Sequence, residues 1–161
     1  MHAGVAVALW AAVAWARKKA GRTPTAPALP QSLEEGERAL AGVRASWRAW
    51  AMLPAVLLGA WVPDWDLYVG GIGFHRSPLF HSVGPVVVAA GLLAVCGLGG
   101  WIRGPALRGL AVGVASHLLW DIVQYGDVRW IRGGNADRLF LLGNAAVLVA
   151  WAVLVGGRKT P

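Results

Sequence analysis

Three short polar stretches hold the residues of this chain whose types and spacing suit chemistry. They read PDWD, HRSPLFHS and SHLLWD. Imidazole and carboxylate side chains together suit zinc, manganese or iron. The stretches therefore predict a site for a divalent metal ion, with zinc preferred. The candidate ligands are Asp64, Asp66, His75, His81, His117 and Asp121.

The spacing within two of the stretches favours ligands that converge. His117 and Asp121 are four residues apart, so on a helix both side chains point the same way, about one turn apart. Asp64 and Asp66 are two residues apart and share one side if the chain is extended after Pro63. Each pair could contribute to one metal ion.

The middle stretch contains a predicted helix start. Ser77 can act as an N-cap, and Pro78 fits the first helical position. The helix would then carry His81 in its first turn, with His75 in the preceding loop. We expect His81 to join the pair on the later helix, and one carboxylate of PDWD to complete the site.

Two of these residues are candidates for direct catalytic roles. A metal ion with an open position lowers the pKa of a bound water, and Asp64 is the candidate general base for that water. Arg76 is planar and always charged, so it could orient an anionic substrate group or stabilise developing charge. Taken singly, each residue also has a structural reading, as a core histidine, a turn, a helix cap or a headgroup anchor. For Asp137 and Asn144 the structural readings, a cap and a packing amide, are preferred.

The composition predicts that these residues are held in a membrane. Of the 161 residues, 57% are hydrophobic and 14% are charged, whereas soluble domains carry about 25% charge. The net charge of +7 does not indicate nucleic-acid binding, because the basic residues cluster at the ends of apolar segments. Most of the ten Trp also lie near segment ends, as in an aromatic belt. The single Cys96 can form no internal disulfide.

The apolar pattern predicts an all-α integral membrane bundle of about five transmembrane helices plus an interfacial amphipathic helix. The apolar segments are expected at 3–16, 50–62, 78–101, 109–125 and 139–155. A Pro-rich linker is expected at 21–37, the amphipathic helix at 38–50 and a loop at 103–108. This organisation divides the chain into an N-terminal transmembrane helix (1–20), a linker with the amphipathic helix (21–50) and a membrane core (51–161).

The distribution of basic residues predicts the orientation of the chain. In a five-span arrangement, eleven Lys and Arg fall on the side of the RKKAGR stretch and four on the other side. The positive-inside rule then places the C-terminus in the cytoplasm and the N-terminus outside. All three polar stretches meet at the outer face of a multi-pass inner-membrane protein.

At these residues the sequence resembles the YdjM-like family of membrane-bound metal-dependent hydrolases. The resemblance covers residues 55–126 and rests on VPDWDL, HRSPLFHS and HLLWD followed by IVQYG. Leu67 stands where the family usually has a histidine, Ser77 stands in place of a glycine, and the middle stretch is one residue longer. The resemblance implies a metal site and, less directly, a hydrolytic reaction.

The preferred interpretation is a metal-dependent hydrolase embedded in the lipid bilayer, with its site at the outer face. A lipid phosphoester is the preferred substrate class, and another anionic substrate is the alternative. A metal-binding, transporter-like protein is the second hypothesis, because intramembrane His and Asp also build ion paths. A non-catalytic membrane scaffold is the third, and it predicts that alanine is tolerated at all six candidate ligands.

Overall fold

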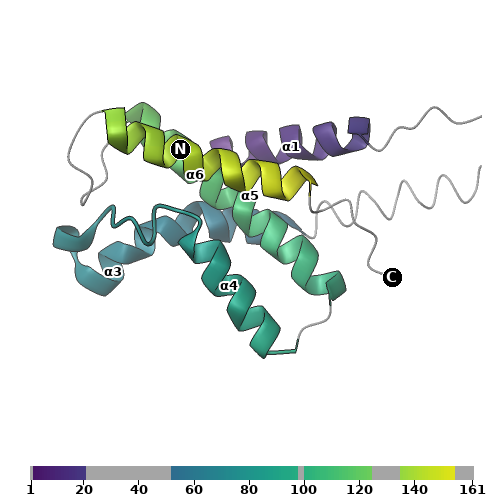
Figure 1. Cartoon of the computed structure of the whole chain (residues 1–161), viewed down its shortest axis with the longest axis horizontal. Coiled ribbons are helices and arrows are strands. Elements are labelled where there is room, and N and C mark those ends of the chain that lie inside the picture. Colours follow the sequence, from purple (N-terminus) through teal and green to yellow (C-terminus); the bar gives the residue numbers. More distant parts are fainter. Residues whose placement is uncertain (1, 21–51, 98–99, 125–134, 155–161) are drawn as a thin grey trace, which may run out of the picture.

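The fold was analysed in a computed structural model that describes residues 2–20, 52–97, 100–124 and 135–154 (Figure 1). Within these ranges the chain forms helices and contains no strand, which confirms the all-α prediction. The predicted linker 21–37 and the amphipathic helix 38–50 lie outside the described residues, as does most of the loop before the last helix.

Long helices alternate with short helical turns along the chain. The first long helix, α1, is His2–Ala20, and a second covers 52–61. Short turns follow in the order η1 (Val62–Trp65), α3 (Asp66–Gly70) and η2 (Ile72–Phe74). The remaining helices are α4 (Gly84–Val95), α5 (Gly100–Gln124) and α6 (Asn135–Leu154).

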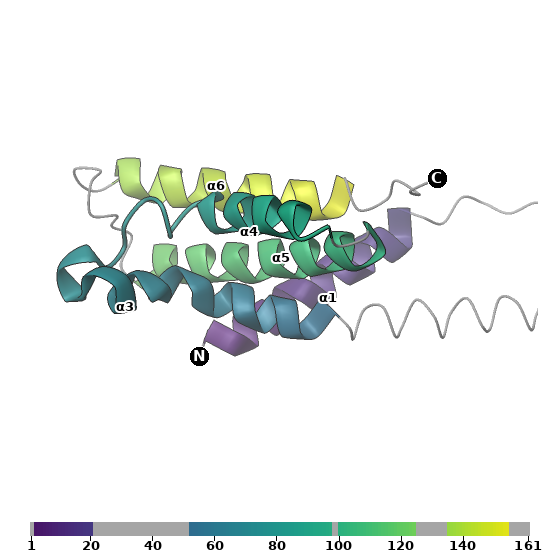
Figure 2. The same cartoon turned by 90° about the horizontal axis from the view of Figure 1, so that it is seen from below.

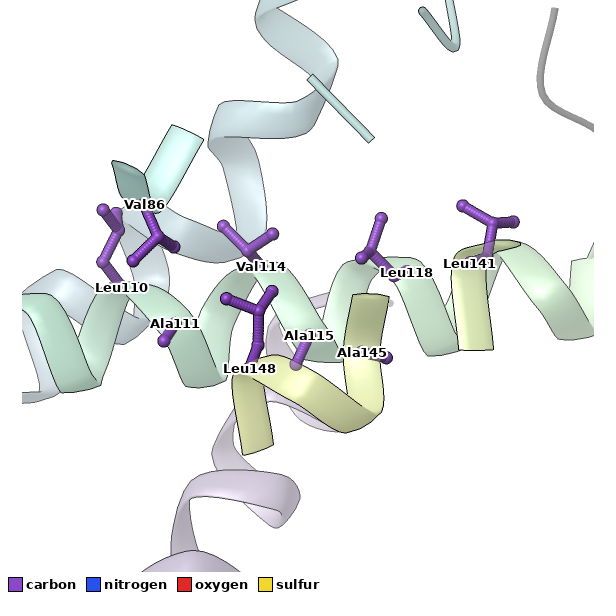
Figure 3. Packing of buried hydrophobic residues seen from close by; sticks show 9 residues of the cluster. All are labelled: Val86, Leu110, Ala111, Val114, Ala115, Leu118, Leu141, Ala145 and Leu148. Atoms are coloured by element: carbon purple, nitrogen blue, oxygen red, sulfur yellow. The ribbon is translucent and has the colours of Figure 1, made fainter. Parts of the chain in front are cut away.

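Helix α5 is the centre of the bundle. It lies between α6 on one side and helix 52–61 on the other (Figure 2). Its apolar contacts with α6 and α4 form the main core, shown in Figure 3. The buried residues of this core are Val86, Leu110, Ala111, Val114, Ala115, Leu118, Leu141, Ala145 and Leu148.

Glycines allow helix 52–61 to approach α5 closely. A Cβ on Gly113 would overlap the carbonyl oxygen of Val56, and one on Gly109 would lie 2.7 Å from the carbonyl oxygen of Met52. On the other helix, a Cβ on Gly59 would overlap the carbonyl oxygen of Leu110. Small residues four apart at a helix interface are typical of membrane helix packing. This contact fixes the place where helix 52–61 ends, and therefore where the PDWD stretch begins.

Two helices in the described part of the chain are long and apolar enough to cross a membrane. They are Gly104–Gln124, which is mostly buried inside the protein, and Asn135–Leu154, of which 28% is buried. Helix α4 is apolar but shorter. The other predicted spans, at 3–16, 50–62 and 78–101, do not add to this number, so the five-span count stays a prediction.

The predicted start of the third apolar segment is wrong. Helix α4 begins at Gly84, not at Ser77, and Pro85 takes the favoured position in its first turn. The backbone N–H of Val83 donates to Asn144 Oδ1 at 3.0 Å, and that of Gly84 donates to Ser82 Oγ at 3.0 Å. The helix also ends early, at Val95, because Gly97 adopts a left-handed φ of 66° that terminates it.

The predicted loop at 103–108 is helical instead. It belongs to α5, which contains Pro105 and begins well before the expected residue 109. Pro105 lies within this helix, so the Gly104–Pro105 pair does not interrupt it. Helix α6 likewise begins at Asn135, four residues before the expected 139.

Candidate metal centre

Figure 1 shows α3, the end of α5 and the start of α6 at the same end of the molecule, and the candidate ligands belong to α3, the adjoining segments and the last turns of α5. Asp64 lies in η1 and Asp66 opens α3. The loop between η2 and α4 carries the two histidines of the middle stretch, and α5 carries the helical His–Asp pair. The three polar stretches therefore meet at one site.

His117 is oriented by the end of helix 52–61. Its Nδ1 lies 2.9 Å from the carbonyl oxygen of Ala60. A carbonyl only accepts hydrogen bonds, so Nδ1 carries a proton and Nε2 points toward the carboxylates. That nitrogen lies 3.4 Å from Asp121 Oδ2 and 3.6 Å from Asp64 Oδ1. A backbone partner behind the ring is the usual arrangement of a metal-binding histidine.

His81 lies between two carboxylates. Its Nδ1 is 3.4 Å from Asp66 Oδ2 and its Nε2 is 3.3 Å from Asp121 Oδ2. Among the described residues, neither ring nitrogen nor Asp121 Oδ2 has a hydrogen-bond partner, and all three atoms are buried. Burial is the largest influence on this ring and lowers the pKa of His81 to about 4. The ring is therefore neutral at pH 7 and available as a ligand.

Asp66 organises the middle stretch. Its side chain is fully buried, with Oδ1 3.1 Å from His75 Nδ1 and Oδ2 accepting a hydrogen bond from the backbone N–H of Ser77 at 3.0 Å. The same Oδ2 faces His81. This one carboxylate thus holds both histidines of HRSPLFHS in position. The Ser77 carbonyl accepts from the N–H groups of Phe80 and His81 at 3.2 and 3.0 Å, so a single turn forms here that does not continue into α4.

The PDWD stretch is helical, contrary to the extended conformation expected for it. Pro63 lies at the first positions of η1, where its fixed φ favours a helical turn. Asp64 and Asp66 nevertheless both reach the cluster, where each of them faces different histidines. Asp64 approaches His117, while Asp66 approaches His75 and His81.

The spacing of the cluster fits a single bound ion. Two ligands that each lie about 2.1 Å from a tetrahedral zinc are about 3.4 Å apart. The nitrogen-to-oxygen distances among His81, His117, Asp121 and Asp64 are 3.3, 3.4 and 3.6 Å. Two sets of three residues have ligand atoms within 4.8 Å of one another: the buried His81, His117 and Asp121, and the partly exposed Asp64 and His75 with His81.

The charge of the cluster also fits a divalent cation. Three carboxylates, Asp64, Asp66 and Asp121, face the imidazoles, and the guanidinium of Arg76 acts electrostatically on Asp121. Buried carboxylates are tolerated only when their charge is compensated. A divalent cation is one group that could compensate it.

Arg76 is the one non-glycine residue with a positive φ in the described ranges, at 63°. This conformation is costly for a residue with a Cβ and persists where the surroundings enforce it. Here the neighbouring His75 and Ser77 are both held by Asp66. The backbone of the middle stretch is therefore shaped by the site itself.

The structure brings together all six predicted ligands and Arg76. It also reveals partners that spacing could not show, namely the Ala60 carbonyl and the Ser77 N–H. Asn144 is a packing amide, as preferred, because it accepts from the Val83 N–H and donates to the Phe140 carbonyl at 2.9 Å. Asp137 is buried in the first turn of α6.

Comparison of the chain with family models, with curated proteins and with solved structures finds no match.

Proposed function

We propose that this protein is a membrane-embedded, metal-dependent hydrolase. The observation that carries the proposal is the meeting of His81, His117 and Asp121 in a buried cluster with ion-ligand spacing. The buried ring nitrogens of His81 and His117 face Asp121 Oδ2 at 3.3 and 3.4 Å, a spacing that a bound cation could share. The resemblance to the YdjM-like hydrolases, carried by the same residues, supports the same interpretation.

The buried trio would hold the ion, with Asp64 and His75 at its more exposed side. Zinc fits this mixed nitrogen and oxygen set best, with manganese or iron as alternatives. When bound, such an ion supplies Lewis acidity at neutral pH. Asp66 positions both His75 and His81 through its two oxygens, so its role is to fix ring orientation.

Two residues are placed to act on a substrate. Asp64 is partly exposed, with 26% of its side chain accessible, and contacts His117, so it is the candidate to accept a proton from attacking water. Arg76 is the candidate to bind an anionic oxygen and to stabilise charge that develops on it. The site thus combines a base and a cationic group beside the cluster.

A lipid phosphoester remains the preferred substrate class. If α5 and α6 cross the bilayer, the last turns of α5 and the start of α6 would lie toward the lipid headgroups, and this supports a lipid substrate. The proposed arrangement is a five-span inner-membrane protein with this end outside. Impermeant labelling of a cysteine at Gln124, and absence of labelling at Gly104, in intact cells would support that orientation. The reverse pattern would contradict it.

The decisive experiment is metal analysis of the purified protein. We expect about one zinc per chain in the wild type and loss of most of it in His117→Ala. Ser116→Ala is the matched control, because Ser116 Oγ donates to the Gly113 carbonyl inside α5 and touches no ligand. Absence of metal in all three proteins would contradict the proposal and favour the scaffold hypothesis.

An assay for lipid hydrolysis separates the hydrolase hypothesis from the transporter-like hypothesis. The zinc-loaded protein should release phosphate or alcohol from a fluorescent phosphatidate or phosphodiester lipid, and Asp64→Asn should lose about 10²-fold or more of that rate while retaining metal. Stoichiometric metal without hydrolysis of any lipid phosphoester would instead favour the transporter-like alternative.

A further inference from the structure

We infer that the segment 61–72, from the end of helix 52–61 through η1 and α3 to the start of η2, forms an apolar knob that inserts into the lipid headgroup region beside the candidate metal centre. The knob consists of Trp61, Trp65, Tyr68, Val69 and Ile72. The inference rests on the proposed membrane-embedded site and adds to it the surface through which that site contacts lipid. The occupant of this surface is a phospholipid interface.

Several apolar side chains of the knob are largely exposed. Tyr68 is 76% exposed, Val69 73% and Ile72 88%. Between 67 and 74 the sequence has no charged residue, and Asp66 at the start of α3 points inward and is fully buried. A contiguous apolar surface without charge marks an interaction site.

The knob is a built structure and not a loose loop. The N–H of Gly71 donates to the Leu67 carbonyl at 3.0 Å, and that of Phe74 donates to the Gly71 carbonyl at 2.9 Å. Gly71 has a φ of 67°, and a Cβ on Gly70 would overlap the Phe74 side chain. These contacts hold Tyr68, Val69 and Ile72 in one outward-facing set.

The residue types favour lipid over a protein partner. Trp61 and Trp65 meet edge to face with ring centroids 6.3 Å apart, and both are exposed, as is Tyr68. Trp and Tyr with one apolar and one polar end are enriched where the bilayer meets water. Lipid-facing surfaces also lack the polar rim expected around a protein interface.

The position of the knob supports the same occupant. Figure 1 shows α3 at the end of the molecule where α6 begins. At that end the candidate span Asn135–Leu154 begins, and its exposed side chains there include Leu139 and Leu142. A bilayer that surrounds α6 would therefore meet α3 at headgroup depth.

The consequence concerns access to the site. Asp66 and Tyr68 are two residues apart in the five-residue α3, so one side of this turn faces the histidines and another faces outward. Insertion by about 5–10 Å would place the partly exposed Asp64 and His75 beside lipid headgroups. A lipid-borne ester would then reach the site from within the membrane plane.

The test is fluorescence quenching in phosphatidylcholine vesicles. Cys96, the only cysteine, is replaced by serine, and single cysteines at Val69, Ile72 or Val147 carry an environment-sensitive fluorophore. All three positions are exposed, so labelling should not disturb the fold. At Val69 and Ile72, a quencher near the headgroup should cause roughly a twofold loss of emission, and aqueous iodide almost none.

The outcomes separate this inference from the proposed function. Val147 lies in the middle of α6 and reports on the span itself, through a quencher placed deep in the acyl chains. Quenching at Val147 by lipid together with iodide quenching at Val69 and Ile72 would overturn the knob but leave the membrane site standing. Protection of Val69 and Ile72 from both quenchers would indicate a protein partner or second copy and would also overturn it. Iodide quenching at all three positions would contradict the membrane-embedded function.

Discussion

The two halves of α5 are held in place by different physical forces. From Gly104 to Ala115 the helix packs through glycines and small apolar side chains against helix 52–61 and α6. From Ser116 to Asp121 the same helix buries an imidazole and a carboxylate at one face and Leu118 at the other. In the first half, the packing contacts are between protein atoms alone. The second half brings together imidazole nitrogens and carboxylate oxygens that could hold a cation.

This difference shows how one helix can serve both as scaffold and as ligand. The close approach at Gly113 fixes the position of Ala60, whose carbonyl orients His117 one turn further along. The apolar contact therefore determines the geometry of the polar cluster. We expect the apolar half to fold without metal and the polar half to depend on it.

Metal removal should have the largest effect on stability. Zinc at 100 to 1,000 times its dissociation constant stabilises the folded state by about 3–4 kcal/mol. Thermal unfolding in detergent should thus show a lower midpoint with chelator than with zinc. His117→Ala should unfold at the same temperature in both conditions, because it lacks the ligand. An equal zinc-dependent shift in wild type and mutant would show that the ion binds elsewhere.

Adding a methyl group to the apolar half of α5 should lower the free energy of unfolding slightly less than metal removal does. Gly113→Ala would force a Cβ against the backbone of Val56 and Ala60, which cannot move like a side-chain end, so we expect a loss of about 3 kcal/mol. Gly143→Ala is the matched control, since its Cβ would meet no atom within 4 Å. It should be neutral or stabilising by up to about 1 kcal/mol. Similar unfolding midpoints for both variants would contradict the close contact.

Weakening the support of the histidines should reduce metal affinity without unfolding the protein. Asp66→Asn removes the charge that faces His75 and His81, and loss of such support typically lowers affinity by about 10–100-fold. Competition with a chromogenic zinc chelator measures this change. Ser116→Ala should bind as the wild type does. Complete loss of metal in Asp66→Asn would indicate that Asp66 is itself a ligand.

The smallest effect is expected where α6 holds the middle stretch. Asn144→Ala removes the acceptor for the Val83 N–H and should cost about 1 kcal/mol of unfolding free energy. Zinc affinity should change little, because His81 is held by Asp66 instead. A loss of affinity as large as that of Asp66→Asn would show that Asn144 positions the site.

Local sequence patterns predicted the helices well where only one pattern was present, such as a helical spacing or a long apolar run. The helical spacing of His117 and Asp121 predicted their shared face, and the apolar run at 139–155 predicted most of α6. Boundaries failed where two signals competed. Ser77–Pro78 and Gly84–Pro85 both suit a helix start: the first begins a single turn, and only the second begins the long helix α4.

By itself, the sequence determined the all-helical class and the identity of the six clustered residues, since residue type and helical period are local properties. Only the tertiary structure decided how these residues meet. The Ala60 carbonyl, the Ser77 N–H and the left-handed Arg76 depend on segments brought together across the fold. Backbone groups are the same in every residue, so no sequence pattern indicates which of them will orient a ligand. Their roles follow from the close crossing of helix 52–61 and α5, where the glycines set the distance.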